Sequence, residues 1–423
     1  MRILKFGGAS VKDADGVKNI ATIIQRFSEP MVIVISAMGK MTNAFEHLVK
    51  SYFDAKQNEI NDNYNKIKAY HHNLVKELFD TDQTNIVDSL LKKLEDKLQS
   101  EASLNYDFEY DQIVPFGELL STHIVSTYLN SVEINNEWVD IRKVLRTDDN
   151  YRNAGVNWEL TQKMMCARFS TNNNQRFITQ GFIGSNENNL TTTLGREGSD
   201  YTGAIIAYAL DANNLSIWKD VPGVLNADPR WYTKAHKIDE LSYWEAIELT
   251  YYGAQVIHPK TIKPLQNKQI PLLVKSFIKP DEDGTVINAT EQAQKLDPIF
   301  VLKKDQTLLS ISPKDFSFIL EQNLSDIFQV VSKHQVKINL MQSSALNFSI
   351  CVDHHKNIGK VIEELSSDFD IRYNEDMELV TIRHYTNAAI NEIISNKEVV
   401  DSQVSRKTAR YVVKKSEWNF NKV

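Results

Sequence analysis

The N-terminal stretch of the chain constrains its fold more than any other. A short apolar run, Ile3–Phe6, ends in Gly7 and Gly8, and apolar residues then recur at helical spacing from Val17 to Phe27. The next apolar run, Met31–Ser36, is continuous and β-branched, which is typical of a central strand in a parallel sheet. A strand, a helix and a strand in this order form a right-handed crossover unit, so the sequence predicts an α/β fold.

The segment Lys5–Ser10, with the sequence KFGGAS, has the chemistry of an anion-binding turn. Glycines let the backbone approach an anion closely, and a helix N-terminus offers unpaired N–H groups. Lys5 adds a positive charge and Ser10 a hydroxyl group. The spacing matches neither the P-loop nor the dinucleotide-binding pattern, and a plain surface turn is the alternative interpretation.

A second polar loop, Ser36–Asn43, follows the second predicted strand. Ligands of parallel sheets bind beyond the carboxyl ends of the strands, so we expect both loops to lie at one edge. Thr42 in this loop could line a site, cap the next helix, or do both. The helical pattern from about Glu46 to Ser100 contains the pair His71-His72, which has no ligand partners at metal spacing and is interpreted as a solvated face.

Thr191–Asp200 is another glycine-containing loop that leads into a helix. It carries Arg196, and an arginine can bind a carboxylate through two parallel hydrogen bonds. Ser199 or Asp200 could cap the helix instead of binding a ligand. Two anion-facing loops in one chain are harder to explain as turn chemistry alone.

Two further segments carry charged candidates. Glu118 falls in the first turn of a predicted helix that opens at Pro115, where it either complements the helix dipole or binds a substrate ammonium group. Lys219–Arg230, with the sequence KDVPGVLNADPR, predicts a hairpin-like excursion after a strand. Lys219 and Arg230 are its cations, and Asp220 is an anion beside the strand end.

Composition excludes several classes of protein. The chain has 423 residues and a net charge of −7, which argues against a nucleic-acid-binding surface. Its two cysteines, Cys166 and Cys351, are too far apart for a metal motif and predict no disulfide framework, which fits the reducing cytoplasm. No apolar run reaches membrane-spanning length, and the N-terminus reaches its glycines too early for a signal peptide.

The C-terminal part has a different pattern. Strands and helices between Leu308 and Arg383 follow the order β-α-β-β-α-β of a ferredoxin-like unit. A helix at Asn387–Ile394 and a strand at Ala409–Lys414 predict part of a second such unit. We expect domains at residues 1–296 and 297–385, with the partial second unit at 386–423.

Seven features in this order resemble the aspartate kinases of the amino acid kinase superfamily: KFGGAS, SAMGKMTN, FGELLS, TLGREGSD, KDVPGVLNADPR, GAQVIHPKT and the C-terminal tail. The resemblance implies a three-layer α/β sandwich followed by ferredoxin-like ACT domains. It implies ATP-dependent phosphorylation of the β-carboxylate of L-aspartate, the first step toward lysine, threonine and methionine. It also implies Mg²⁺ bound mainly to the phosphates, and a homodimer formed through the ACT domains.

The same resemblance implies roles for individual residues. Lys5 would bridge the phosphates during transfer, and Asp200 would orient Lys5 without taking a proton. Glu118 would bind the substrate ammonium group and Arg196 the α-carboxylate, with Thr42 and Ser199 completing the aspartate pocket. Nucleotide binding would involve Lys5 together with Gly7, Gly8, Ser10, Lys219, Asp220, Leu225, Arg230 and Gln255. No protein residue is expected to be a dedicated metal ligand.

Several positions depart from the family pattern. Ala9 stands where threonine is usual, Glu197 where glycine is usual, and Leu225 where tyrosine is usual. Gln255 replaces a lysine that commonly touches ATP, and we hypothesise that Lys219, in place of threonine or serine, compensates for it. The effector-binding loop at 319–324 lacks the usual glycine, so lysine, threonine and no effector all stay open as alternatives.

Two alternative functions follow from the residues. One is another amino acid kinase, acting on glutamate or a related acid. The other is a non-catalytic, amino-acid-sensing subunit with a kinase fold, which the four substitutions at Ala9, Glu197, Leu225 and Gln255 would support. Against the second stands a set of charges that are costly to bury without a function: Lys5, Glu118, Arg196 and Asp200.

Overall fold

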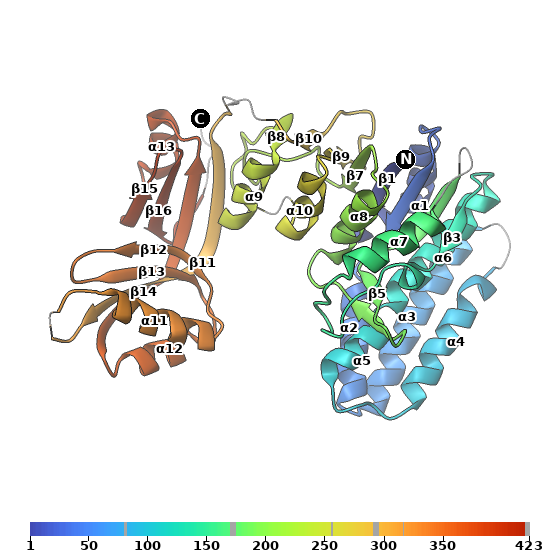
Figure 1. The fold of residues 1–423 in the computed structure, drawn as a ribbon, viewed down its shortest axis with the longest axis horizontal. Helices are drawn as coiled ribbons and strands as arrows, with labels where there is room; N and C mark the ends of the chain where they lie inside the picture. Colours follow the sequence, from blue (N-terminus) through green and yellow to red (C-terminus); the bar gives the residue numbers. More distant parts are fainter. Residues whose placement is uncertain (80–82, 170–174, 255–256, 291–295, 316, 419–423) are drawn as a thin grey trace. The chain divides into compact units, whose positions relative to one another are not determined.

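The computed structural model of the chain describes residues 1–79, 83–169, 175–254, 257–290, 296–315 and 317–418. They form two compact units (Figure 1). The first comprises Met1–Val224, Lys237–Ile247 and Val256–Glu291, and the second comprises Leu225–His236, Glu248–Gln255 and Gln292–Val423. Within the described part of the chain, every helix is too short or too polar to cross a membrane.

The first unit is built on an eight-stranded sheet with the order β3-β4-β2-β1-β7-β9-β10-β8. Neighbouring strands are parallel except for the antiparallel pair β9–β10. The central strands are the predicted apolar runs, and all five residues of Met31–Ile35 are buried. The strands are β1 Arg2–Phe6, β2 Met31–Ile35, β3 Glu137–Val139, β4 Arg176–Gln180, β7 Asn214–Lys219, β8 Glu240–Ser242, β9 Leu272–Ser276 and β10 Thr285–Asn288. A separate antiparallel pair is formed by β5 Ile183–Ser185 and β6 Thr191–Thr193.

Helices cover both faces of this sheet, as the predicted three-layer sandwich requires. Leu4 and Phe6 of β1 pack in one core cluster with residues of α1, α3, α4 and α6. Because side chains alternate along a strand, Lys5 faces the other layer, where α8 contacts β1, β2 and β7. The helices of this unit are α1 Ala14–Ile24, α2 Met41–Phe53, α3 Gln57–Leu78, α4 Asn85–Gln99, α5 Tyr106–Ile113, α6 Phe116–Ser131, α7 Trp158–Arg168, α8 Gly198–Ala209, α9 Tyr243–Tyr252 and α10 Pro259–Asn267.

The histidine pair on α3 does not form a solvated face, so that interpretation is wrong for His71. The His71 side chain is fully buried, and its Nδ1 lies 2.8 Å from the carbonyl oxygen of Ile67. It belongs to the apolar face of α3, which also buries Leu74 and Val75. His72 lies on the neighbouring face, with Nε2 2.9 Å from Asp88 Oδ1.

The second unit contains a six-stranded antiparallel sheet with the order β12-β13-β11-β14-β16-β15. The run from β11 to β14 follows the predicted β-α-β-β-α-β order of a ferredoxin-like unit. Figure 1 labels its strands and the helices that accompany them. Their bounds are β11 Ile299–Pro313, α11 Glu321–Lys333, β12 Ile338–Ser343, β13 Phe348–Asp353, α12 Ile358–Leu365, β14 Phe369–Arg383, α13 Asn387–Ile394, β15 Val399–Val404 and β16 Thr408–Lys414.

The C-terminal elements complete a second four-stranded arrangement by sharing strands with the first. β11 and β14 are each 15 residues long, and β14 pairs with β16 along Met377–Arg383. The half of β11 that starts at Ile299 pairs with this same half of β14. Strand β15, which the sequence analysis did not predict, forms the edge beyond β16. A short C-terminal tail is therefore enough to complete the second arrangement, because two of the four strands in that arrangement, β11 and β14, belong to the first ferredoxin-like unit.

Candidate active site

A pocket of about 610 Å³ opens in the first unit, at the carboxyl ends of β1 and β2. The structure brings most of the predicted site residues together there. Those that line the pocket are Lys5, Gly7, Gly8, Ser10, Thr42, Glu118, Arg196, Ser199, Asp200, Lys219 and Asp220. They come from the ends of β1 and β7 and the residues that follow them, from the loop before α8, and from the first turns of α2, α6 and α8.

The glycine turn after β1 packs tightly against the loop after β2. A Cβ atom at Gly8 would lie 2.8 Å from the carbonyl oxygens of both Ala37 and Gly39, so only glycine fits. The Gly39 N–H donates to the Gly8 carbonyl oxygen at 2.9 Å. The turn continues as a short 3₁₀ helix, Gly8–Val11, and α1 begins only at Ala14, after its cap at Asp13. The helix predicted by the apolar spacing from Val17 therefore follows the glycine turn after this 3₁₀ helix, with Asp13 as its N-cap.

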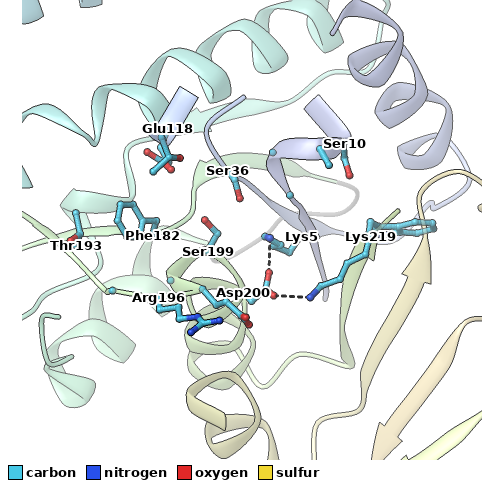
Figure 2. Close-up of a pocket in the computed structure, with 18 of the residues that line it drawn as sticks. Lys5, Ser10, Ser36, Glu118, Phe182, Thr193, Arg196, Ser199, Asp200 and Lys219 are labelled. Carbon is cyan, nitrogen blue, oxygen red and sulfur yellow. Dashed lines mark ion pairs between the residues drawn. The ribbon is translucent and has the colours of Figure 1, made fainter. Parts of the chain in front are cut away.

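An ion cluster occupies the centre of the pocket, with Lys5 and Asp200 buried and Lys219 partly exposed (Figure 2). Lys5 Nζ lies 2.5 Å from Asp200 Oδ1, and Lys219 Nζ lies 3.7 Å from Asp200 Oδ2. Burial alone would raise the pKa of the Asp200 carboxyl, but the ammonium groups of Lys5 and Lys219 outweigh it and hold that pKa below its ordinary value. Asp200 is therefore an anion at neutral pH, held between two cations.

Glu118 provides a carboxylate with unused hydrogen-bonding capacity. It is 2% exposed, and its Oε1 accepts a hydrogen bond from the Ala37 N–H at 3.2 Å. Its Oε2 has no hydrogen-bond partner among the described residues. Burial raises the pKa of Glu118 to about 8, against the lowering effect of the Ala37 N–H. A buried, unsatisfied carboxylate oxygen at a pocket is a site that an ammonium ligand would satisfy.

The three residues for which a helix-capping role was an alternative do not cap. Helix α8 begins at Gly198 and is flanked by Glu197, so Ser199 and Asp200 fall inside its first turn. Helix α2 begins at Met41 and is flanked by Lys40, which leaves Thr42 inside that helix. The capping alternative is therefore wrong for Thr42, Ser199 and Asp200, and all three side chains remain available to the pocket.

The structure explains how the negative charge of Glu197 is tolerated beside the pocket, which the sequence alone did not. The backbone of Glu197 is left-handed, with φ of +54°. Its Oε2 accepts a hydrogen bond from the backbone N–H of His258 at 3.0 Å, and His258 is the flanking residue of α10. The carboxylate thus lies close to the positive ends of both α8 and α10, which offsets its charge beside the pocket.

Three predicted nucleotide-binding residues are not part of this pocket as described. Arg230 forms an ion pair with Asp228 at 2.5 Å, and Leu225 and Arg230 are not among the lining residues. They lie on the turn-rich excursion after β7, which is closed by a 2.9 Å hydrogen bond from the Asn226 N–H to the His236 carbonyl oxygen. Gln255 lies outside the described residues.

Some lining residues were not predicted. Phe182 and Thr193 lie on the side of the pocket away from Lys219 (Figure 2). Glu46 and Tyr110 belong to the same lining, and the Tyr110 hydroxyl donates to Glu46 Oε1 at 2.8 Å. Glu46 follows Thr42 by four positions, and this spacing, which puts two residues on one helix face, could have identified it. The other lining residues outside the prediction are Ala9, Ser36, Arg152, Gly195, Glu197, Gly198 and Trp218.

Comparison with known proteins identifies the family. Residues 1–276 match the family model described as "Amino acid kinase family". The chain is 31% identical over 363 residues to lysine-sensitive aspartokinase 3 of Escherichia coli, covering 83% of this chain and 78% of that protein. It is 32% identical over 409 residues to chloroplastic aspartokinase 1 of Arabidopsis thaliana, covering 93% and 70%.

Solved structures agree with this assignment. The E. coli aspartokinase III complex with lysine and aspartate (T-state) has a TM-score of 0.82 and 26% identity, covering 98% of this chain and 96% of that one. The complex of the same enzyme with aspartate and ADP (R-state) has a TM-score of 0.80 and 25% identity, with the same coverage. The chain therefore belongs to the amino acid kinase family and, within it, to the aspartokinases.

Proposed function

We propose that this chain transfers the γ-phosphoryl group of ATP to the β-carboxylate of L-aspartate, giving 4-phospho-L-aspartate. One observation supports this most: a single pocket holds the Lys5–Asp200–Lys219 cluster together with the unsatisfied carboxylate of Glu118 and the guanidinium of Arg196. Among the solved relatives, an aspartokinase with aspartate and ADP has this fold.

The proposed reaction needs no general base. A β-carboxylate is already ionised at neutral pH, so the nucleophile is ready when it is bound. The enzyme must align the carboxylate with the phosphoryl group and neutralise the charge on the transferring oxygens. Lys5 would supply that positive charge, and Asp200 would hold Lys5 in place. The two lysine ammonium groups hold the pKa of Asp200 below its ordinary value, which makes this carboxylate a weaker base and suits an orienting role.

The acceptor would bind through its α-amino and α-carboxylate groups. Glu118 would accept hydrogen bonds from the ammonium group, using the Oε2 atom that has no described partner. Arg196 would bind the α-carboxylate, and Thr42 and Ser199 would add hydroxyl donors at the same pocket. With the α-groups held, the β-carboxylate is left to face the phosphates.

The nucleotide would enter with its phosphates over the glycine turn. Gly7, Gly8 and Ser10 would bind phosphate oxygens, and Lys219 would add a second cation beside Asp220. The remaining proposed nucleotide contacts are Leu225, Arg230 and Gln255. Mg²⁺ would arrive bound to the phosphates, because this ion keeps several waters and is usually held by substrate phosphates with one or two carboxylates.

Assembly, regulation and location are also proposals. Exposed apolar side chains beside the edge strand β12, such as Phe318, Met341 and Leu346, support a homodimer formed through the ACT unit. Lysine is the effector to test first, because the E. coli relative is lysine-sensitive by name. Two free cysteines, Cys166 and Cys351, support a cytoplasmic location.

A hydroxamate assay with purified protein, MgATP and L-aspartate tests the proposal. Acyl-phosphate should form with L-aspartate and not with L-glutamate, and lysine or threonine added separately should show which amino acid regulates. Glu118→Gln should raise the KM for aspartate, while Glu133→Gln, on an exposed turn outside the pocket, serves as the matched control. No product from either acid would support the alternative of an amino-acid-sensing subunit.

A further inference from the structure

Arg152 is a charged residue in an unusual backbone conformation at the edge of the pocket. Its φ is +64°, in the left-handed region that favours glycine, and the residue lines the same pocket as Arg196 and Glu118. Backbone strain of this kind persists where the surrounding structure enforces it, and it gathers at ligand-binding sites. Nothing in the reaction as proposed above uses this arginine.

The backbone of Arg152 is held by a buried carboxylate. Asp111 is fully buried, and its Oδ2 accepts hydrogen bonds from the N–H groups of Arg152 at 3.1 Å and Thr193 at 2.8 Å. Its Oδ1 accepts the Thr193 hydroxyl at 2.7 Å. The N–H of Ala154 donates to the Thr193 carbonyl oxygen at 2.9 Å. The turn that carries Arg152 is therefore fixed to the Thr193 wall of the pocket, away from Lys219 (Figure 2).

The side chain of Arg152 is partly exposed and contacts Tyr106, Tyr110 and Asp107. Its guanidinium lies 4.5 Å from the centre of the Tyr110 ring, and its Nη1 lies 3.1 Å from Asp107 Oδ1. The side chains of this ion pair are 47% and 54% exposed. Exposed ion pairs contribute little, so a ligand carboxylate can compete with Asp107 for the guanidinium. A fixed backbone with an available cation is a suitable arrangement for capturing an anion.

The positive charge of Arg152 lies on the side of the pocket that also carries the acidic side chains of Glu46 and Glu118. Glu46 accepts the Tyr110 hydroxyl, and Glu118 influences the same tyrosine, whose pKa is raised by burial first and then by the glutamates. An acceptor that carries two carboxylates would meet these two acidic side chains, and the cations of the pocket lining that are not paired with Asp200 are Arg152 and Arg196. Lys5 and Lys219 are paired with Asp200 at the phosphate end.

We propose that Arg152 is a second carboxylate-binding residue for the acceptor, sharing the α-carboxylate with Arg196. This inference rests on the proposed function, because it concerns the same acceptor. It makes Arg152 a specificity-determining residue: it favours an acceptor with a free α-carboxylate and contributes little to ATP binding.

Arg152→Gly is the sharpest test, because glycine adopts the left-handed backbone freely and only the side chain is lost. We expect the KM for aspartate to rise by about tenfold or more, the loss expected for a charge-assisted hydrogen bond, with the KM for ATP within about twofold of the wild type. Arg152→Lys should recover part of the affinity. Arg26→Ala removes a paired arginine outside the pocket and serves as the matched control. Equal KM values for aspartate in Arg152→Gly and the wild type would overturn the proposal.

A second acceptor substrate distinguishes the loss of α-carboxylate binding from a general disturbance of the pocket. Wild-type enzyme should prefer L-aspartate to its α-amide, and Arg152→Gly should reduce that preference, since the amide has no charge for Arg152 to bind. An unchanged preference would contradict the assignment even if both KM values rose. If the wild type forms no acyl-phosphate, the proposed function fails, and calorimetric titration of L-aspartate into both proteins still tests Arg152.

Discussion

Lys5 Nζ and Asp200 Oδ1 lie 2.5 Å apart at the centre of the pocket, and the two residues are 7% and 3% exposed. Lys5 reaches this position because alternation along β1 turns it away from Leu4 and Phe6, toward the layer that contains α8. Asp200 reaches it from the first turn of α8. Two segments about 200 residues apart in sequence thus form one charge pair, and the account of phosphoryl transfer depends on it.

Replacing Asp200 with asparagine should leave Lys5 without its orienting anion. We expect kcat to fall by about 100-fold or more, the size typical of lost electrostatic stabilisation at a reacting centre. The KM for aspartate should change little, because Glu118 and Arg196 are untouched. Steady-state kinetics would show this, with Asp211→Asn, in an exposed ion pair with Lys268, as the control. A rise in the KM for aspartate at normal kcat would contradict the orienting role.

The raised pKa of Glu118 predicts a pH dependence. A pKa of about 8 means that the carboxyl is mostly protonated at pH 7, whereas an ammonium ligand needs the carboxylate. The ionised fraction rises about fivefold between pH 7 and pH 8, so the KM for aspartate should fall by about that factor. Glu118→Gln should raise this KM and remove the dependence. The same pH profile in the variant would show that another group is responsible.

Glu197→Gly tests whether the negative charge of Glu197 is tolerated because its carboxylate binds the His258 N–H and lies near the N-termini of α8 and α10. Glycine relieves about 1–2 kcal/mol of left-handed strain, while the lost hydrogen bond to His258 costs about 0.5–1.5 kcal/mol. Because these effects oppose each other, thermal unfolding should shift little and kcat should stay near the wild-type value. A large loss of kcat would mean that the carboxylate takes part in transfer.

Lys219→Thr tests the suggestion that Lys219 supplies a nucleotide cation. Its Nζ lies 3.7 Å from Asp200 Oδ2, in the part of the pocket where we propose that the phosphates bind. We expect the KM for ATP to rise more than the KM for aspartate, because the lost charge faces the phosphates. The two constants can be measured in one set of initial-rate experiments. The reverse order would remove Lys219 from the nucleotide site.

Much of this fold could be predicted from the sequence, because local patterns determine it. The continuous apolar run at Met31–Ile35 required a buried parallel strand, and the glycine turn after Phe6 located the pocket edge. Gly8 is fixed by the close approach of Ala37, a constraint that a glycine pair in this position already indicates. The motifs that contain Lys5, Glu118 and Asp200 likewise predicted that these three residues belong to one site.

The remaining features depend on contacts that no local pattern records. Asp111 joins Thr193 to Arg152 across 82 and 41 positions of sequence, so only the folded chain shows that these residues share a wall. His71 is buried because it lies on the face of helix α3 that packs against the core, whereas the side chain of the next residue, His72, is partly exposed. The sharing of β11 and β14 between two ferredoxin-like arrangements likewise depends on strand length and register.

Identification of the acyl-phosphate by trapping tests the central claim most directly. Wild-type protein would be incubated with MgATP, L-aspartate and hydroxylamine, and the hydroxamate identified by mass spectrometry and NMR against α- and β-aspartyl standards. The account predicts β-aspartyl hydroxamate, formed only when ATP is present and strongly reduced in Asp200→Asn. The α-isomer, or no hydroxamate from protein that still binds aspartate, would contradict it.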